Sequence, residues 1–169
     1  MGFFTKPEAG AVAQPVLAPL SHQRIIDRLD AQGFTYGVDD DGDIGGRWDD
    51  HLFYFFRLGA DGEFLQVRGR WTREVPLSEA DALTRAANQW NLDTLWPKAY
   101  VRVEGDDVGV YAEHVVSYEH GLTDEQLDLH MACGISTALQ LFAHLDELYP
   151  QAAEAAKAQL AAYRANDDD

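Results

Sequence analysis

Residues 51–71 read HLFYFFRLGADGEFLQVRGRW, and this stretch decides the fold class. Its second half alternates strictly between two sets of side chains, Leu65, Val67, Trp71 and Gln66, Arg68, Arg70. Such alternation is typical of a half-buried antiparallel strand. The first half is apolar on both sides, which suits a central strand. A short turn at Asp61-Gly62 separates the two halves, so the stretch predicts two strands of an antiparallel sheet.

The flanking segments extend this pattern to a mixed fold. Ser21 is predicted to cap a short helix that ends near Gln32, and Ser78 with Asp81 a second helix. Thr123 and Gln126 form a capping box before a long helix that ends near residue 148. Further strands are predicted at 34–38, 44–48, 99–105 and 108–118. The order α-β-β-β-β-α-β-β-α indicates an α+β fold, in which helices cover one face of an antiparallel sheet.

The two ends of the chain differ in composition from its middle. Residues 1–19 carry three prolines among alanine and glycine and are expected to form a flexible N-terminal arm. Residues 150–169 read as an Ala-rich helical extension with an acidic tail. We therefore expect one domain at 20–149, which is an ordinary length for a single hydrophobic core.

The charge balance excludes two classes of partner. The net charge is −16, with 13 basic against 29 acidic residues. Nucleic acids and anionic membranes are bound by excess Lys and Arg, so neither is expected as a partner. The single cysteine, Cys133, excludes an internal disulfide and suits a reducing compartment. The chain shows no signal-peptide pattern and no membrane-length apolar run, so a cytoplasmic location is expected.

The acidic stretch VDDDGDIGGRWDD at 38–50 raises the question of calcium binding. An EF-hand loop beginning at Asp39 would need Gly at its sixth position and Glu at its twelfth, but Ile44 and Asp50 stand there. The flanking segments are also strands rather than helices. Asp41-Gly42 between two alternating runs is instead a strong hairpin pattern. The stretch therefore predicts a turn.

No catalytic or metal-binding set stands out. His130 and Cys133 are three residues apart in the long predicted helix, but no third ligand completes a metal site. Cys133 is placed in the apolar stripe of that helix, where a reactive thiolate is disfavoured. The G-x-S-x-G, Walker and G-x-G-x-x-G motifs are absent from the sequence. We therefore predict no catalytic residue, no metal and no cofactor, and we expect a protein that is not an enzyme.

Arginines concentrate on the predicted strands. They are Arg47, Arg57, Arg68, Arg70, Arg73 and Arg102. If helices cover one sheet face, several of these side chains project together from the other face. One interpretation is cross-strand pairing with Glu63, Glu104 or Glu113. The other is a surface that docks an acidic segment of a protein partner, with Arg47, Arg57, Arg68, Arg70 and Arg102 as the candidate binding residues.

Several short motifs occur together in one order and spacing. They are DGDI at 41–44, Trp48, Trp71, NQWN at 88–91, PKAY at 97–100 and GLTDEQL at 121–127. Together they resemble the YbjN domain family of bacterial sensory transduction regulators, over roughly residues 20–149. The resemblance implies a fold like that of the type III secretion chaperones, a curved antiparallel sheet packed on helices. It carries over no catalytic residues.

The same resemblance shapes the functional hypotheses. Type III secretion chaperones are small, acidic, often dimeric cytosolic proteins that bind extended client segments. The primary hypothesis is thus a non-enzymatic, regulatory or chaperone-like module that binds another protein. The alternative is a small-molecule or metal-responsive sensor with a pocket between the sheet and the long helix. A homodimer stays open. A deep pocket with convergent polar groups would favour the sensor, and an aromatic and arginine surface would favour the binding module.

Overall fold

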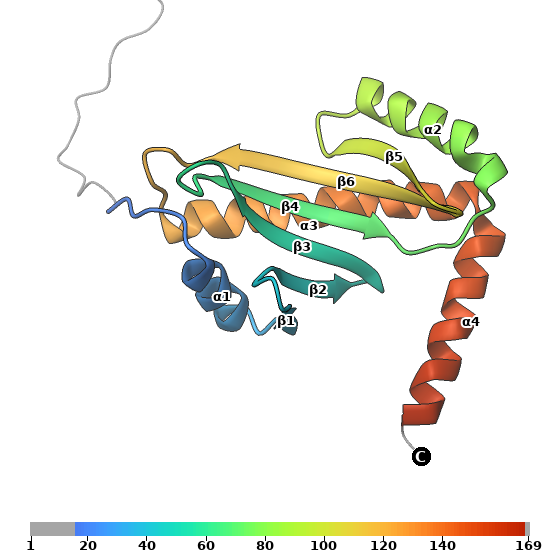
Figure 1. Cartoon of the computed structure of the whole chain (residues 1–169), viewed down its shortest axis with the longest axis horizontal. Coiled ribbons are helices and arrows are strands. Elements are labelled where there is room, and N and C mark those ends of the chain that lie inside the picture. The colour runs from blue at the N-terminus through green and yellow to red at the C-terminus, as the bar shows by residue number, and fades with distance from the viewer. Residues whose placement is uncertain (1–15, 168–169) are drawn as a thin grey trace, which may run out of the picture.

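The computed structural model describes residues 16–167, and its centre is an antiparallel sheet with a long helix along one face (Figure 1). The helices are α1 (His22–Ala31), α2 (Ala80–Asp93), α3 (Asp124–Leu148) and α4 (Pro150–Asp167), with a 3₁₀ turn at Leu77–Glu79. The strands are β1 (Tyr36–Val38), β2 (Ile44–Trp48), β3 (His51–Leu58), β4 (Phe64–Trp71), β5 (Lys98–Glu104) and β6 (Asp107–Ser117). The predicted α+β class and the predicted order of elements are confirmed.

The sheet is antiparallel throughout and has the order β1-β2-β3-β4-β6-β5. Strands β1 to β4 follow one another as a meander. After α2, the β5–β6 hairpin joins the sheet with β6 beside β4, so that Trp71 pairs with Val110 and Arg68 with Glu113. This pairing joins strands that are separated in the chain by α2 and β5.

The hydrophobic core lies between the sheet and α3. The predicted buried set of β4, Leu65, Val67 and Trp71, is at most 1% exposed. From α3, Phe142 is fully buried and its ring lies 6.0 Å from that of Phe53 on β3. Gly134 of α3 faces Val67, where an added Cβ would lie 2.6 Å from the Cβ of the valine. Phe142 fills the space beside Phe53, whereas Gly134 leaves room for Val67, so α3 can approach the sheet closely.

Two of the three predicted helix caps are present. The Ser21 hydroxyl accepts a hydrogen bond from the backbone N–H of Arg24. Thr123 and Gln126 form the full capping box at the start of α3. The prediction for Ser78 was wrong, because this residue lies inside the 3₁₀ turn and α2 begins after Glu79, which makes no side-chain cap bond. The turn satisfies the first backbone groups of α2 in place of a side chain.

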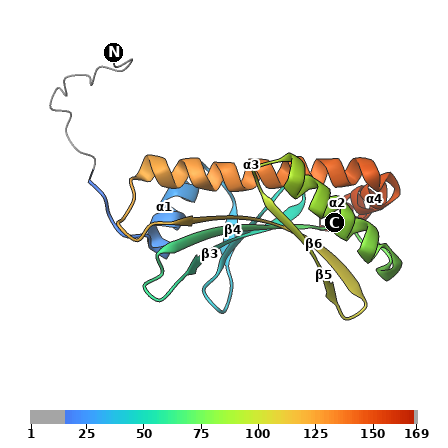
Figure 2. The same cartoon turned by 90° about the horizontal axis from the view of Figure 1, so that it is seen from above.

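The helices leave one sheet face uncovered. Figure 2 shows α3 running along the opposite face with α1 beside it. Arg28 of α1 holds Asp128 of α3 through two hydrogen bonds of 2.8 and 2.6 Å. Helix α2 packs against the edge strand β5, where the Asn91 side chain both donates to and accepts from the backbone of Ala99. This contact occupies backbone groups at a sheet edge that would otherwise be free to pair.

The segments at the two ends attach differently. Ala18 forms a short antiparallel bridge with Leu122, and the Arg24 guanidinium donates to the carbonyl oxygens of Ala18 and Pro19 at 2.7 and 3.1 Å. The rest of the predicted N-terminal arm, residues 1–15, lies outside the described residues. Helix α4 extends away from the sheet (Figure 1). No helix among residues 16–167 is long and apolar enough to cross a membrane.

Candidate protein-binding surface

The strand register decides which arginines share the uncovered sheet face, called here the open face. Its principal side chains are Arg47, Leu52, Tyr54, Phe56, Gln66, Arg68, Arg70, Lys98, Tyr100, Arg102, Glu104, Asp107, Tyr111 and Glu113. Four of the five candidate arginines therefore lie on it. Arg57 does not, because it pairs with Leu65, whose side chain points toward α3. Several of the arginines thus project from one face, whereas Arg57 lies on the other.

Arg47 and Arg57 also have local contacts in turns. Arg57 donates from Nε to the Gly62 carbonyl at 3.0 Å and from Nη2 to the Asp61 carbonyl at 2.9 Å, across the β3–β4 turn. Arg47 donates to the Asp50 carbonyl at 2.9 Å in the turn between β2 and β3. Both side chains thus satisfy backbone carbonyls in turns, and Arg57 has no part in the open face.

Arg68, Arg70 and Arg102 line a cavity of about 320 Å³ on the open face. We call it the arginine pocket, and its lining consists of Leu52, Tyr54, Phe56, Arg68, Arg70, Arg102, Glu104 and Tyr111. The side chains come from β3, β4, β6 and β5, so the pocket extends from the centre of the sheet to the edge strand β5. Period-two alternation on four strands brings them to one surface.

Aromatic rings form the walls of the arginine pocket. Tyr54 and Phe56 stack at a centroid separation of 5.4 Å. Tyr111 stacks at 5.3 Å on Tyr100, which lies on the open face beside the pocket. The Arg68 guanidinium lies 4.9 Å from the Phe56 ring centroid. Such cation–π contact holds a guanidinium flat against an apolar surface. The period of β3 could have indicated Tyr54 and Phe56, but the strand is apolar on both faces, a pattern typical of a central strand that is buried on both sides.

Glu113 is the buried anion of this surface. Its carboxylate is 6% exposed and accepts hydrogen bonds from Arg68 at 3.0 Å, Lys98 at 2.9 Å and Tyr100 at 2.5 Å. Burial by itself would raise the pKa of Glu113, but the hydrogen bonds from Tyr100 and Lys98 and the charges of Lys98 and Arg68 outweigh it and lower that pKa. The carboxylate therefore stays ionised, and with three donors engaged it is a poor general base.

The predicted pairing of arginines with glutamates is present in part. Arg68 pairs with Glu113 and Arg102 with Glu104, and Arg70 pairs with Asp107 at 3.3 Å. Glu63 instead accepts a hydrogen bond from the backbone N–H of Asp61. On strands β3 to β6 the open face carries four basic side chains, including Lys98, against three acidic ones. Asp39 and Asp43 lie beside Arg47 at the β1–β2 end of the face. The part around the arginine pocket is thus locally positive in a chain whose net charge is −16.

The acidic stretch after β1 forms a turn, as predicted. The Asp39 carboxylate accepts hydrogen bonds from the backbone N–H groups of Asp41 and Asp43 at 3.1 and 2.9 Å. Gly42 has a φ of 85°, the left-handed conformation that glycine adopts readily. The first carboxylate of the stretch thus caps its own backbone.

Two of the histidines form a pair on the sheet face that α3 covers. His114 of β6 and His130 of α3 share a hydrogen bond of 3.0 Å between Nε2 and Nδ1. Cys133 is half-buried rather than deep in the core, and burial raises the pKa of its thiol. Within residues 16–167, no three His, Cys, Asp or Glu side chains gather so that they could hold a metal ion.

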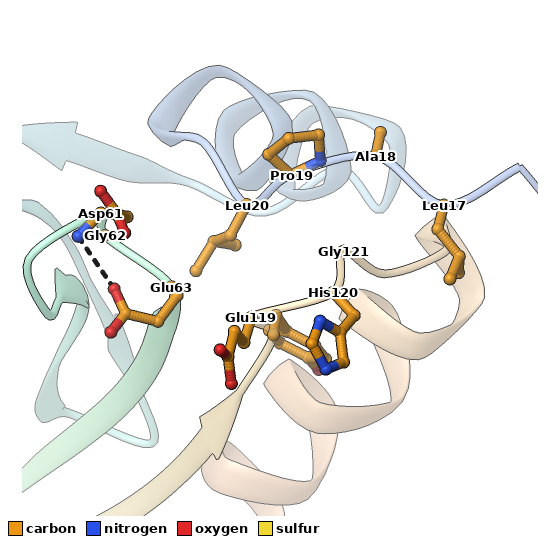
Figure 3. A pocket seen from close by; sticks show the side chains of 11 residues that line it. Leu17, Ala18, Pro19, Leu20, Asp61, Gly62, Glu63, Glu119, His120 and Gly121 are labelled. Carbon is orange, nitrogen blue, oxygen red and sulfur yellow. Dashed lines mark hydrogen bonds between the residues drawn. The ribbon is translucent and has the colours of Figure 1, made fainter.

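A second cavity, of about 460 Å³, lies where residues 17–20 meet the β3–β4 turn and the connection from β6 to α3 (Figure 3). Figure 3 shows Glu63 turned back toward the backbone of Asp61, with Glu119 and His120 across the cavity from it. The side chains of Glu119 and His120 are exposed. The cavity therefore lacks the convergent buried polar groups of a ligand site.

The family model and one solved structure agree with this architecture. The family model YbjN, described as "Putative bacterial sensory transduction regulator", matches residues 21–147. The crystal structure of YbjN from E. coli is similar with a TM-score of 0.68 at 13% identity, covering 79% of this chain and 96% of that chain. A chain of the HopA1–SchA chaperone–effector complex is similar with a TM-score of 0.47 at 16% identity, covering 76% and 99%. No curated protein matches this chain in sequence.

Proposed function

This chain belongs to the YbjN family, and we propose that it is a non-enzymatic, cytoplasmic regulatory or chaperone-like module that binds another protein through its open face. One observation carries the proposal: an uncovered sheet face combines paired aromatic rings with a local excess of arginine. Aromatic and arginine side chains are the types that contribute most to binding energy at protein interfaces. We assign the binding to the predicted domain at residues 20–149.

The charge of the open face selects the occupant. Its excess of positive charge complements an acidic segment of a partner. A second copy of this chain, placed face to face by two-fold symmetry, would bring Arg70 and Arg102 of one copy against the same positive surface of the other. We therefore propose an extended acidic segment of a different protein as the occupant.

The alternative of a sensor pocket between the sheet and α3 has less support. Phe53, Val67 and Phe142 are at most 1% exposed and fill the space between these layers. Close packing of this kind leaves no room for a ligand. The arginine pocket lies on the opposite side of the sheet.

Site-specific photo-crosslinking in a lysate of the source organism tests the proposal. A photoreactive amino acid replaces Tyr54 on the open face, and the matched control replaces Leu129, which is 64% exposed on α3. We expect a crosslinked protein from position 54 that is absent from position 129. The same product should disappear in Arg70→Gln/Arg102→Gln and persist in Arg85→Gln, which removes an exposed arginine from α2.

Two results would overturn the proposal. The first is an identical set of products from both positions, which would place the contact elsewhere. The second is a product that contains only a second copy of the chain. The arginine variant is suitable because both of its ion pairs are partly exposed, so its free energy of unfolding should change by only about 1 kcal/mol.

A further inference from the structure

The three arginines of the arginine pocket are only partly used by the protein itself. Arg68 pairs through Nε, Arg70 through Nη2 and Arg102 through Nε. Within residues 16–167, the remaining guanidinium nitrogens of these three side chains have no hydrogen-bond partner. A guanidinium presents five donors in a planar fork, so each arginine keeps donors available for an incoming acceptor.

One of these donors is buried. The Nε of Arg70 is shielded from solvent and has no partner within the described part of the chain. The Arg70 side chain as a whole is 34% exposed, so an incoming acceptor can reach it. Buried donors are nearly always hydrogen-bonded in folded proteins, and this one favours such an acceptor. Gln66, four residues before Arg70 on the same face of β4, is 6% exposed, and its Oε1 is likewise without a partner in the described part of the chain. The open face thus offers a donor at Arg70 and an acceptor at Gln66 to a bound segment.

From this geometry we propose that the arginine pocket binds the carboxylate of a glutamate side chain in the partner segment, an inference that rests on the proposed function. A carboxylate matches the fork of a guanidinium with two parallel hydrogen bonds. The pocket volume of about 320 Å³ and the rings of Tyr54 and Tyr111 accommodate the methylene groups of glutamate. The backbone N–H groups of the same segment are the donors that Gln66 lacks.

The pocket suits a carboxylate better than a phosphate. Glu104 lines the same cavity as the three arginines. It pairs with Arg102 and so reduces the positive charge that is available to a doubly charged phosphate. The cavity is also built from strand side chains and includes no helix N-terminus, the element that commonly adds backbone donors for phosphate.

Fluorescence anisotropy with labelled synthetic peptides tests the assignment. The probe is a peptide of alternating Glu and Tyr with both ends blocked, and its counterparts carry Gln or phosphoserine in place of Glu. Because the chain is strongly acidic, binding of an acidic peptide requires a local positive site. We expect the Glu peptide to bind at least about tenfold more tightly than either counterpart.

Arginine variants distinguish binding in the arginine pocket from non-specific attraction of the peptide to any positive charge on the protein. Arg70→Gln and Arg102→Gln should each weaken binding of the Glu peptide by about tenfold, which is the order expected for a charge-assisted bidentate contact. Arg70→Lys should weaken it by several-fold, because lysine keeps the charge but lacks the fork. Arg85→Gln, the matched control on α2, should leave affinity within about twofold of the unaltered chain.

Three outcomes would overturn the assignment. They are equal binding of the Glu and Gln peptides, tighter binding of the phosphoserine peptide, and equal loss of affinity in Arg70→Gln and Arg85→Gln. These outcomes are distinct from failure of the proposed function. If the crosslink from position 54 persists while the peptides show no dependence on the arginines, the surface binds a protein but the pocket has another role. If no protein is crosslinked from position 54 either, the open face is not the binding surface.

Discussion

His51 shows how strongly one residue depends on its surroundings. It begins β3, is 3% exposed, and its ring lies 4.6 Å from that of Phe142. Its Nδ1 accepts a hydrogen bond from the backbone N–H of Thr72 at 3.2 Å. Burial first, and then the positive charge of Arg73, lower the pKa of His51 from 6.5 to about 4. The imidazole is therefore neutral at physiological pH.

This shift makes the stability of the protein depend on pH. The folded pKa lies below the unfolded one, so the unfolded chain takes up the proton first as the pH falls. The contribution of His51 is complete above about pH 6.5 and is lost as the pH falls toward 4. We expect the wild-type chain to lose about 2 kcal/mol more free energy of unfolding than His51→Gln between pH 7.5 and pH 5. Urea titrations at both pH values measure this difference, and parallel profiles for the two chains would contradict it.

At the scale of elements, the contact between α3 and β4 depends on a glycine inside a helix. Glycine is unfavourable there by about 1 kcal/mol relative to alanine. Gly134 nevertheless lies where any Cβ would come within 2.6 Å of the Cβ of Val67. The residue therefore sets the distance between the helix and the sheet, at a cost in local helix stability.

Gly134→Ala should destabilise the protein in spite of the better helix propensity of alanine. We expect a loss of about 1–3 kcal/mol, because the added methyl group overpacks the contact with a β-branched residue. The double variant Gly134→Ala/Val67→Ala should cost less than the sum of the two single changes, since the second truncation removes the clash. Chemical denaturation of all four chains gives the coupling energy. A stabilising Gly134→Ala would mean that α3 does not approach β4 this closely.

Phe142 provides a second test of the α3 contact. Its ring is fully buried against Phe53 and His51. Phe142→Ala should cost about 3–5 kcal/mol, from lost apolar burial and the cavity that remains. Leu129→Ala on the same helix is the control, because Leu129 is 64% exposed and its truncation should cost less than about 0.5 kcal/mol. Similar urea midpoints for the two variants would show that the buried face of α3 is assigned wrongly.

At the scale of the whole molecule, the buried side chains are distributed unequally between α4 and the rest of the protein. The sheet and α3 contain most of the buried apolar side chains, whereas the only buried side chain of α4 among those described is Ala153. Just before α4, Tyr149 contacts the Trp71 ring at 5.9 Å and donates a hydrogen bond to Glu79 at 3.1 Å. The stabilising contacts at this end of the protein thus precede α4.

Removal of α4 should therefore have a small effect. A chain ending at Tyr149 is expected to lose less than about 1.5 kcal/mol, because little apolar surface of α4 is buried. Tyr149→Ala in the full chain should cost more, about 2–3 kcal/mol, since it deletes an aromatic contact and a hydrogen bond. Circular dichroism should show the loss of helix in the truncated chain only. The reverse order of the two stabilities would mean that α4 belongs to the folding unit.

Much of the fold could be predicted from sequence because its determinants are local. The alternation of Leu65, Val67 and Trp71 with polar residues specifies the two faces of β4 whatever strand lies beside it. The capping box at Thr123 acts within one helical turn. The turn at 39–43 is likewise made by its own side chains and backbone. Segment types, their order and the family resemblance follow from such patterns.

The composition of the site was decided by the tertiary structure. Arg68 contacts Glu113 only because β6, rather than β5, pairs with β4 in one particular register. Arg57 falls on the other face through its pairing with Leu65, and Ser78 loses its predicted role because a 3₁₀ turn precedes α2. The arginine pocket combines side chains of four strands. The physical reason is that each strand carries its own alternation of faces, whereas the partner of a strand and its register depend on the free energy of packing the whole sheet against α3.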